Sequence, residues 1–134
     1  MKTNSKLVSL SILLFLFLSA SSTFAADDGN TKPRLSSSAI FSGTADIVNQ
    51  SSVSGNVKGV SCSYINSAQA NLIFTVNGAA AQTIDMSGGV PDVNGDRHTG
   101  WVPMNIRFTS SIRVQIQYTG FSGQAGCTVS WALD

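Results

Sequence analysis

The chain has 134 residues, with eight basic and seven acidic side chains, and its net charge at pH 7 is +1. This near-neutral balance, with the basic residues scattered, excludes the electrostatic footprint of a protein that binds nucleic acid or anionic membranes. Every acidic residue is aspartate, and Ser, Thr, Asn, Gly and Val are abundant. Such a composition favours strands and turns over helices.

The first 25 residues have the three parts of a secretory signal peptide. Lys2 and Lys6 precede an apolar run at residues 7–18, and small residues follow. The apolar run is shorter than the roughly 20 residues of a membrane-spanning helix, which disfavours the alternative of an uncleaved anchor. Thr23 and Ala25 fit positions −3 and −1 of a cleavage site. We therefore expect cleavage after Ala25 and a protein that is secreted or periplasmic.

Cleavage would leave residues 26–134, with six basic and seven acidic side chains and a net charge of −1. Residues 26–38 are polar, with Pro33 and three consecutive serines, and predict a flexible leader. Residues 39–134 then form a single domain with a modest core.

The two cysteines, Cys62 and Cys127, predict a disulfide, because an exported chain reaches an oxidising compartment. The bond would join an early strand to the last one and close a loop of about 65 residues. In the chain-entropy model such a loop contributes about 2–4 kcal/mol, a large share of the stability of a small domain.

Alternation of apolar and polar residues predicts the strands of the first half of the domain. The first candidate spans residues 39–48, with a bulge expected at Gly43. The second spans residues 52–65, in which Gly55 or Gly59 marks a bulge or bend. Its expected buried face consists of Val60, Cys62 and Tyr64.

Asn77-Gly78 lies between two apolar-patterned runs, residues 70–76 and 80–86, and is a strong hairpin signal. A long loop, residues 87–98, follows. Three more alternating stretches complete the chain, and they span residues 101–109, 112–119 and 127–133. Seven or eight strands with turns every 8–12 residues favour an antiparallel β-sandwich, with a small closed barrel as the second choice.

Catalytic chemistry finds little support in the sequence, and we expect no enzyme. His98 is the sole histidine, which removes most histidine-dependent metal sites, and no nucleophile elbow is present. A glycosidase would need an aspartate pair, and the nearby carboxylates of Asp85, Asp92 and Asp96 lie in or beside a loop.

The segment Asp92-Val93-Asn94-Gly95-Asp96 places oxygen donors at relative positions 1, 3 and 5, as a calcium loop does. Arg97 stands where such a loop has glycine, and Pro103 stands where it has a bidentate carboxylate. A polar surface turn is therefore favoured over a metal site formed by Asp92, Asn94 and Asp96.

Several residues expected to face solvent are candidates for binding. Trp101 adjoins the long loop and is one of them. Trp131 alternates in step with the apolar residues of the last strand, so we expect it to be buried in the core. Arg107 and Arg113 lie on the polar parity of consecutive strands, so they are candidates to frame one exposed sheet face, although ordinary solvated charges have the same pattern. Asn49-Gln50-Ser51 is a glycosylation sequon.

The exported, seven-to-eight-strand pattern with Cys62 and Cys127 resembles small secreted bacterial proteins with a fibronectin-III or immunoglobulin-like sandwich, including interleukin-receptor mimics. The sequence departs from the immunoglobulin pattern at two positions. Phe74 stands near the place of the core tryptophan, and Ala125 stands in place of the tyrosine of the tyrosine corner. The resemblance implies a sandwich and a role in virulence through binding of a host cytokine or receptor.

The expected function is therefore a secreted, non-catalytic module that binds a protein partner through sheet faces and the loops at residues 87–98 and 120–126. A structural or adhesive subunit of a surface fibre is one alternative, with residues 26–38 reaching a neighbour's sheet edge. A carbohydrate-binding module that uses Trp101 and a calcium ion is another. Exposed sheet edges also make a homodimer an option.

Overall fold

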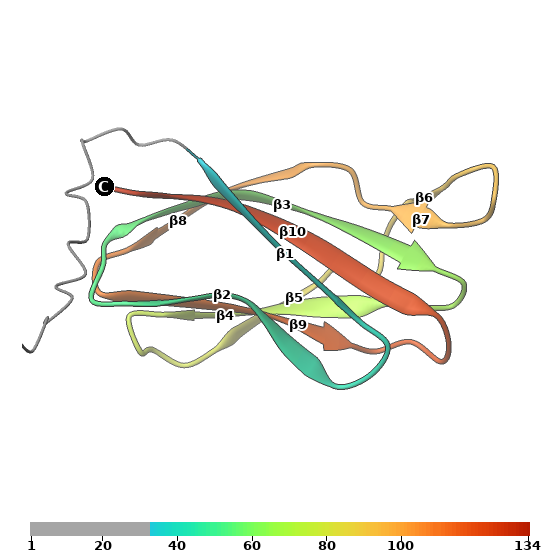
Figure 1. Cartoon of the computed structure of the whole chain (residues 1–134), viewed down its shortest axis with the longest axis horizontal. Helices are drawn as coiled ribbons and strands as arrows, with labels where there is room; N and C mark the ends of the chain where they lie inside the picture. The colour runs from blue at the N-terminus through green and yellow to red at the C-terminus, as the bar shows by residue number, and fades with distance from the viewer. Residues whose placement is uncertain (1–32) are drawn as a thin grey trace, which may run out of the picture.

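The computed structural model describes residues 33–134, and the predicted signal peptide lies outside these residues. Ten strands form the described part of the chain (Figure 1). They are β1 (Arg34–Ile40), β2 (Thr44–Ser51), β3 (Gly55–Ile65), β4 (Ala70–Val76), β5 (Gln82–Asp85), β6 (Val90–Pro91), β7 (Arg97–His98), β8 (Val102–Phe108), β9 (Ser111–Tyr118) and β10 (Gln124–Leu133).

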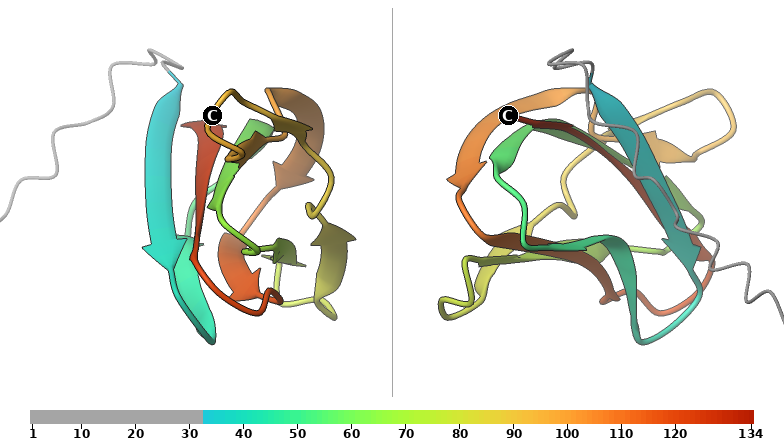
Figure 2. Two further views of the ribbon diagram at one scale, coloured as in Figure 1. Left: turned by 90° about the vertical axis from the view of Figure 1, so that its right-hand side faces the viewer. Right: turned by 60° about the vertical axis from the view of Figure 1, so that its left-hand side comes forward.

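The strands form two antiparallel sheets that pack face to face (Figures 1 and 2). The first sheet has the order β1-β10-β3-β7-β6, and β8 pairs with β3 on the same side as β7. The second sheet has the order β2-β9-β4-β5. The predicted β-sandwich is confirmed, and the sheets do not close into a barrel.

The strand order is that of a jelly roll. If the short β6 and β7 are set aside, each strand except β4 is followed by a strand of the opposite sheet. Alternation between sheets is typical of the eight-stranded double Greek key. The immunoglobulin order instead places several consecutive strands side by side in one sheet. The sandwich that the resemblance implied is therefore present, with a different winding.

The core lies between the sheets and follows the period-two pattern. Val60, Cys62 and Tyr64 point inward from β3, as predicted. Trp131 is buried, as predicted, and only 3% of it is exposed. The largest buried side chains of the core come from both sheets, and they include Tyr64, Phe74, Phe108, Leu72, Ile112 and Ile116.

The prediction of a flexible leader over residues 26–38 is wrong from Arg34 onward, because β1 pairs with β10 along its whole length. Its polar side chains have partners there. Trp131 Nε1 donates a hydrogen bond of 3.0 Å to Ser36 Oγ, and the guanidinium of Arg34 lies 5.3 Å from the centre of the Trp131 ring. The Ser37 hydroxyl also lies 2.7 Å from Thr128 Oγ1, so two of the three serine hydroxyl groups bond across to β10 and support this edge strand.

Residues 39–48 are not one strand, and Gly43 is not a bulge. Residues 41–43 form a turn that carries the chain from β1 in the first sheet to β2 in the second. A bulge does occur in β3, where Lys58 has no partner between Val57 and Gly59 in the pairing with β10 or β8. It keeps both Val57 and Val60 facing the core.

Asn77-Gly78 forms the predicted turn between β4 and β5, and both residues have positive φ values, 52° and 71°. The loop 87–98 is partly ordered as the small β6–β7 hairpin. The described residues contain no helix long and apolar enough to cross a membrane.

Candidate functional site

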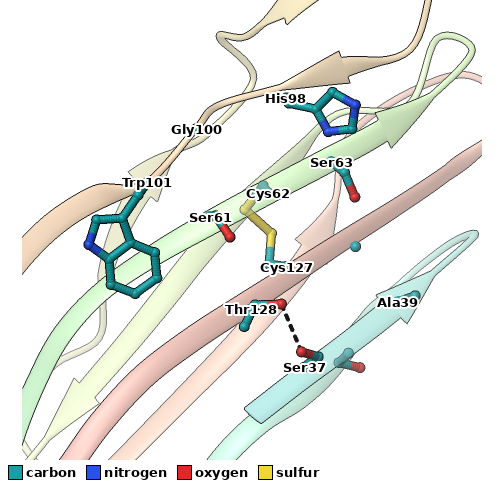
Figure 3. A pocket seen from close by; sticks show the side chains of 12 residues that line it. Ser37, Ala39, Ser61, Cys62, Ser63, His98, Gly100, Trp101, Cys127 and Thr128 are labelled. Carbon is teal, nitrogen blue, oxygen red and sulfur yellow. Dashed lines mark hydrogen bonds between the residues drawn. A yellow bond between two sulfur atoms is a disulfide. The ribbon is translucent and has the colours of Figure 1, made fainter. Parts of the chain in front are cut away.

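A broad groove lies on the outer face of the first sheet, over β10 and β3 (Figure 3). Its volume is about 740 Å³, within the usual range for small-molecule sites. Strand β1 borders one side, and residues 98–101 border the other. The disulfide between Cys62 and Cys127 is buried beneath the floor. This bond confirms the pairing predicted from the sequence.

Strand register explains why the groove has only small side chains on its floor. Partners across adjacent strands point to the same side of a sheet, so Ser63 lies beside Gly126, and Gly126 lies beside Ala39. The neighbouring outward row consists of Ser61, Thr128 and Ser37. These side chains are all small and uncharged, so no large side chain fills the space above the centre of the sheet.

Trp101 forms one end of the groove and is 52% exposed. The segment before it is fixed to β3, since Thr99 N donates to the Cys62 carbonyl and Cys62 N donates to Thr99 Oγ1, at 3.0 and 2.9 Å. The indole lies directly on Gly59, where a Cβ atom would come within 2.3 Å of Trp101 Cζ2. Glycine at that position lets the ring lie on the sheet.

His98 lies at the groove border beside Ser63, its partner in β3. Its Nε2 atom is 3.7 Å from Asp92 Oδ2, and both side chains are partly exposed. The other carboxylate oxygen, Asp92 Oδ1, accepts hydrogen bonds from the backbone N–H groups of Asn94 and Asp96, at 2.8 and 3.1 Å. This is an Asx-type turn at the tip of the β6–β7 hairpin.

The hydrogen bonds within the turn satisfy the Asp92 Oδ1 atom without a cation. Within residues 33–134, no three His, Cys, Asp or Glu side chains are grouped to hold a metal ion. The sequence favoured such a turn over a calcium site at Asp92, Asn94 and Asp96, and a calcium titration of the melting temperature would test the calcium alternative.

Arg107 and Arg113 do not frame one sheet face, so that prediction is wrong. The turn between β8 and β9 carries the chain from the first sheet to the second, and the two arginines lie on different sheets. Each also has an acidic partner. Arg107 pairs with Asp134 at 2.9 Å, and Arg113 Nε pairs with Asp46 Oδ1 at 2.9 Å.

A second candidate surface, the three-loop end, consists of residues 41–43, 65–69 and 119–123 (right-hand end in Figure 1). Tyr118 N donates to the Gly43 carbonyl, and Thr119 N donates to the Gln69 carbonyl, so the three segments are neighbours. Phe41 and Phe121 are 70% and 99% exposed there. The surface therefore presents two bare aromatic rings.

The loop that carries Phe121 is held on both sides. A Cβ atom at Gly120 would lie 2.5 Å from the Ser67 carbonyl oxygen, and one at Gly123 would lie 1.9 Å from the Ile65 carbonyl oxygen. Gly123 also has a φ of 96°, which disfavours other residues. The backbone thus packs closely on the 65–69 turn, and the phenyl ring points into solvent.

Residues 120–126 are among the loops predicted to contact a partner, but no sequence pattern singled out Phe41 or Phe121. The groove was not predicted, because a run of serines gives no apolar signal. The available sign was the alternation of Ser61 and Ser63 with buried Val60, Cys62 and Tyr64, which leaves only hydroxyl groups on the outer face.

Comparisons with known proteins return structural likeness only. No protein-family model and no curated protein sequence matches the chain. The capsid structure of Helicobacter pylori bacteriophage KHP30 is 17% identical with a TM-score of 0.49, and the match covers 75% of this chain and 87% of that one. The VP2 subviral particle of infectious bursal disease virus is 12% identical with a TM-score of 0.42, over 76% of this chain and 32% of that one.

Proposed function

We propose that the protein is an exported, non-catalytic module that binds a protein partner with its three-loop end. The observation that carries the proposal is the full exposure of Phe121 on a loop whose backbone is packed closely on the neighbouring turn. An aromatic ring in water contributes nothing to the core, whereas burial of such a ring in a partner's pocket is a common source of binding energy.

The chemistry of the surface describes the partner. Residues 41–43, 65–69 and 119–123 contain no charged side chain, so the contact would be apolar at its centre with neutral polar groups around it. A host receptor or cytokine with an apolar pocket fits this description. Because the loop is pre-organised, little conformational entropy is lost when it docks.

Site-specific crosslinking tests this proposal. A photoreactive phenylalanine analogue at position 121 is expected to capture one partner from the protein's natural surroundings. The same analogue at Ala80, in the exposed β4–β5 loop at the opposite end, is the matched control and should not capture it.

The purified partner must then bind the purified protein saturably. We expect Phe121→Ser and Phe41→Ser each to weaken binding by at least about tenfold, while Ala80→Ser leaves it unchanged. Equal capture at positions 121 and 80, or equal affinity of the Phe121→Ser variant, would contradict the proposal. Transfer of the phenylalanines into lipid vesicles instead of a protein would also contradict it.

A structural or adhesive subunit is the second candidate, because β1, among residues 33–134, is an edge strand of the first sheet with a partner on one side only. Such an edge can accept a strand from another copy. Sedimentation would distinguish the candidates. Assemblies of several copies that lengthen with protein concentration, and that are shorter for the Ser37→Pro variant, would favour the structural subunit. A protein that sediments as a monomer at all concentrations would exclude this candidate.

A further inference from the structure

The groove on the outer face of the first sheet is independent of the three-loop end and has its own chemistry. Its floor crosses from β1 over β10 and β3 to the segment that carries Trp101. At about 4.8 Å per strand spacing, the floor is roughly 14 Å wide. This width, with a volume of about 740 Å³, suits a small, elongated ligand.

Side-chain hydroxyl groups are the polar groups on the floor that could contact a ligand. Ser61, Ser63 and Thr128 project from the two central strands, and Ser37 Oγ lies 2.7 Å from Thr128 Oγ1. Each hydroxyl can donate one hydrogen bond and accept two. Of the described residues that line the groove, none is Lys, Arg or Asp, so the groove has no fixed charge to hold an ionic ligand.

A peptide is disfavoured as the occupant. Over the floor, β10 is paired with β1 on one side and with β3 on the other. The far side of β3 is covered by β8, Thr99 and β7, so the backbone groups of both strands are not free to extend the sheet with an added strand. Recognition there must use side chains. The exposed face of the Trp101 indole, held on Gly59, is an apolar platform beside those hydroxyls.

We propose that this groove binds a neutral carbohydrate, with one sugar ring stacked on Trp101 and the sugar hydroxyls bonded to Ser61, Ser63 and Thr128. A sugar ring has apolar C–H faces and a polar rim, which match an indole platform flanked by hydroxyl groups. The site does not require the Asp92–Asp96 turn, so binding is expected without calcium.

Titration with uncharged oligosaccharides tests the proposal, with gluco-, manno- and galacto-configured trisaccharides as the probes. Tryptophan fluorescence is a direct readout, because Trp101 is half-exposed and Trp131 is buried. We expect a saturable change in emission with at least one probe, and the same dissociation constant by calorimetry. The change should persist in a calcium chelator.

Two variants and two controls decide the outcome. Trp101→Ala removes the platform and Ser61→Leu fills the floor, and each should weaken binding by at least about tenfold. Val93→Ser, at the fully exposed hairpin tip, and Phe121→Ser, at the three-loop end, should leave binding unchanged. Circular dichroism confirms that each variant is folded.

Absence of binding to every probe, or unchanged affinity in the Trp101→Ala and Ser61→Leu variants, would overturn the proposal. Because Phe121→Ser separates the two surfaces, failure here leaves the protein-binding proposal standing.

Discussion

The Tyr64 hydroxyl donates a hydrogen bond to the backbone carbonyl of Met86 and so joins the two sheets through the core. Tyr64 lies on β3 and is fully buried, whereas Met86 follows β5 and its N–H donates to the Ala70 carbonyl in the second sheet. Burial raises the pKa of the Tyr64 hydroxyl, and the nearby charge of Asp85 raises this pKa further. Tyr64 is therefore held in its neutral, donating form.

Tyr64→Phe is expected to lower the free energy of unfolding by about 1–3 kcal/mol, because the Met86 carbonyl loses its buried donor. Urea denaturation at neutral pH measures the loss. Tyr118→Phe is the matched control, since the Tyr118 hydroxyl is only part-buried and lies 3.4 Å from the Gly123 carbonyl oxygen. It should cost less. Equal stability of the Tyr64→Phe variant and the natural protein would contradict the role assigned to this bond.

The same group predicts alkaline behaviour. The folded-state pKa of Tyr64 lies above the ordinary value of 10.0, so its stabilising contribution is complete below pH 10 and is lost as the pH rises above it. The natural protein should therefore lose stability above pH 10 more steeply than Tyr64→Phe. Parallel denaturation curves for the two proteins from pH 9 to pH 11 would show that another group controls this range.

The disulfide joins Cys62 and Cys127, which lie directly opposite each other on β3 and β10, 65 residues apart in sequence. Reduction is expected to lower the free energy of unfolding by about 2–4 kcal/mol, chiefly through the greater entropy of the unfolded chain. A double variant, Cys62→Ala with Cys127→Ala, should match the reduced protein and show no response to reductant. A natural protein that melts at the same temperature with and without reductant would refute this prediction.

Period-two patterning predicted the elements whose apolar face is buried. It placed β4, β9 and β10 and the burial of Trp131, because alternation directly encodes a sheet with one face in the core. It failed for β1, since Ser36 and Ser38 occupy the inward parity of the strand in place of apolar residues, and the Ser36 hydroxyl accepts a hydrogen bond from Trp131 instead. The residues that stabilise β1 belong to β10, about 95 residues away in the sequence, so no local sequence pattern could predict this strand.

Strand order and surface sites were also beyond local patterns. Arg107 and Arg113 are six residues apart, yet the turn between them changes sheets. The groove requires β1, β10, β3 and the Trp101 segment to be adjacent, and adjacency follows from the jelly-roll winding. The loops that carry Phe41 and Phe121 likewise lie at the same end because of that winding.

An exposed ion pair makes acid stability testable. Arg113 Nε and Nη2 donate to the two carboxylate oxygens of Asp46 at 2.9 and 3.3 Å, and they link β9 to β2. This hydrogen bonding lowers the pKa of the Asp46 carboxyl below 3.8. Its contribution to stability is thus present above about pH 4 and is lost as the pH falls through the depressed folded-state value.

Asp46→Asn should consequently cause a small loss of stability at pH 7, because both side chains are partly exposed to solvent. The difference from the natural protein should shrink as the pH falls below 3.8, and it should also shrink at high salt. Asp96→Asn, in the exposed β6–β7 hairpin, is the control. If the Asp46→Asn difference stayed constant from pH 7 to pH 2, the ion pair would not be its cause.

Asn77 links two turns at the end of the sandwich opposite Phe121. Its φ of 52° shapes the β4–β5 turn, and its side-chain Oδ1 accepts from the backbone N–H groups of Thr109 and Ser110, at 2.8 and 2.9 Å. The side chain thus stabilises the turn by which β8 passes to β9 in the other sheet. Asparagine fits both tasks because it tolerates positive φ and carries an acceptor.

Three substitutions separate these tasks. Asn77→Asp keeps the acceptor and should remain close to the natural protein. Asn77→Gly keeps the backbone conformation but removes the acceptor, and it should lower the free energy of unfolding by about 1–2 kcal/mol. Asn77→Ala loses both features and should be the least stable, as measured by urea denaturation. A glycine variant as stable as the natural protein would assign the role of Asn77 to its backbone alone, whereas an alanine variant no worse than glycine would assign it to the side-chain oxygen.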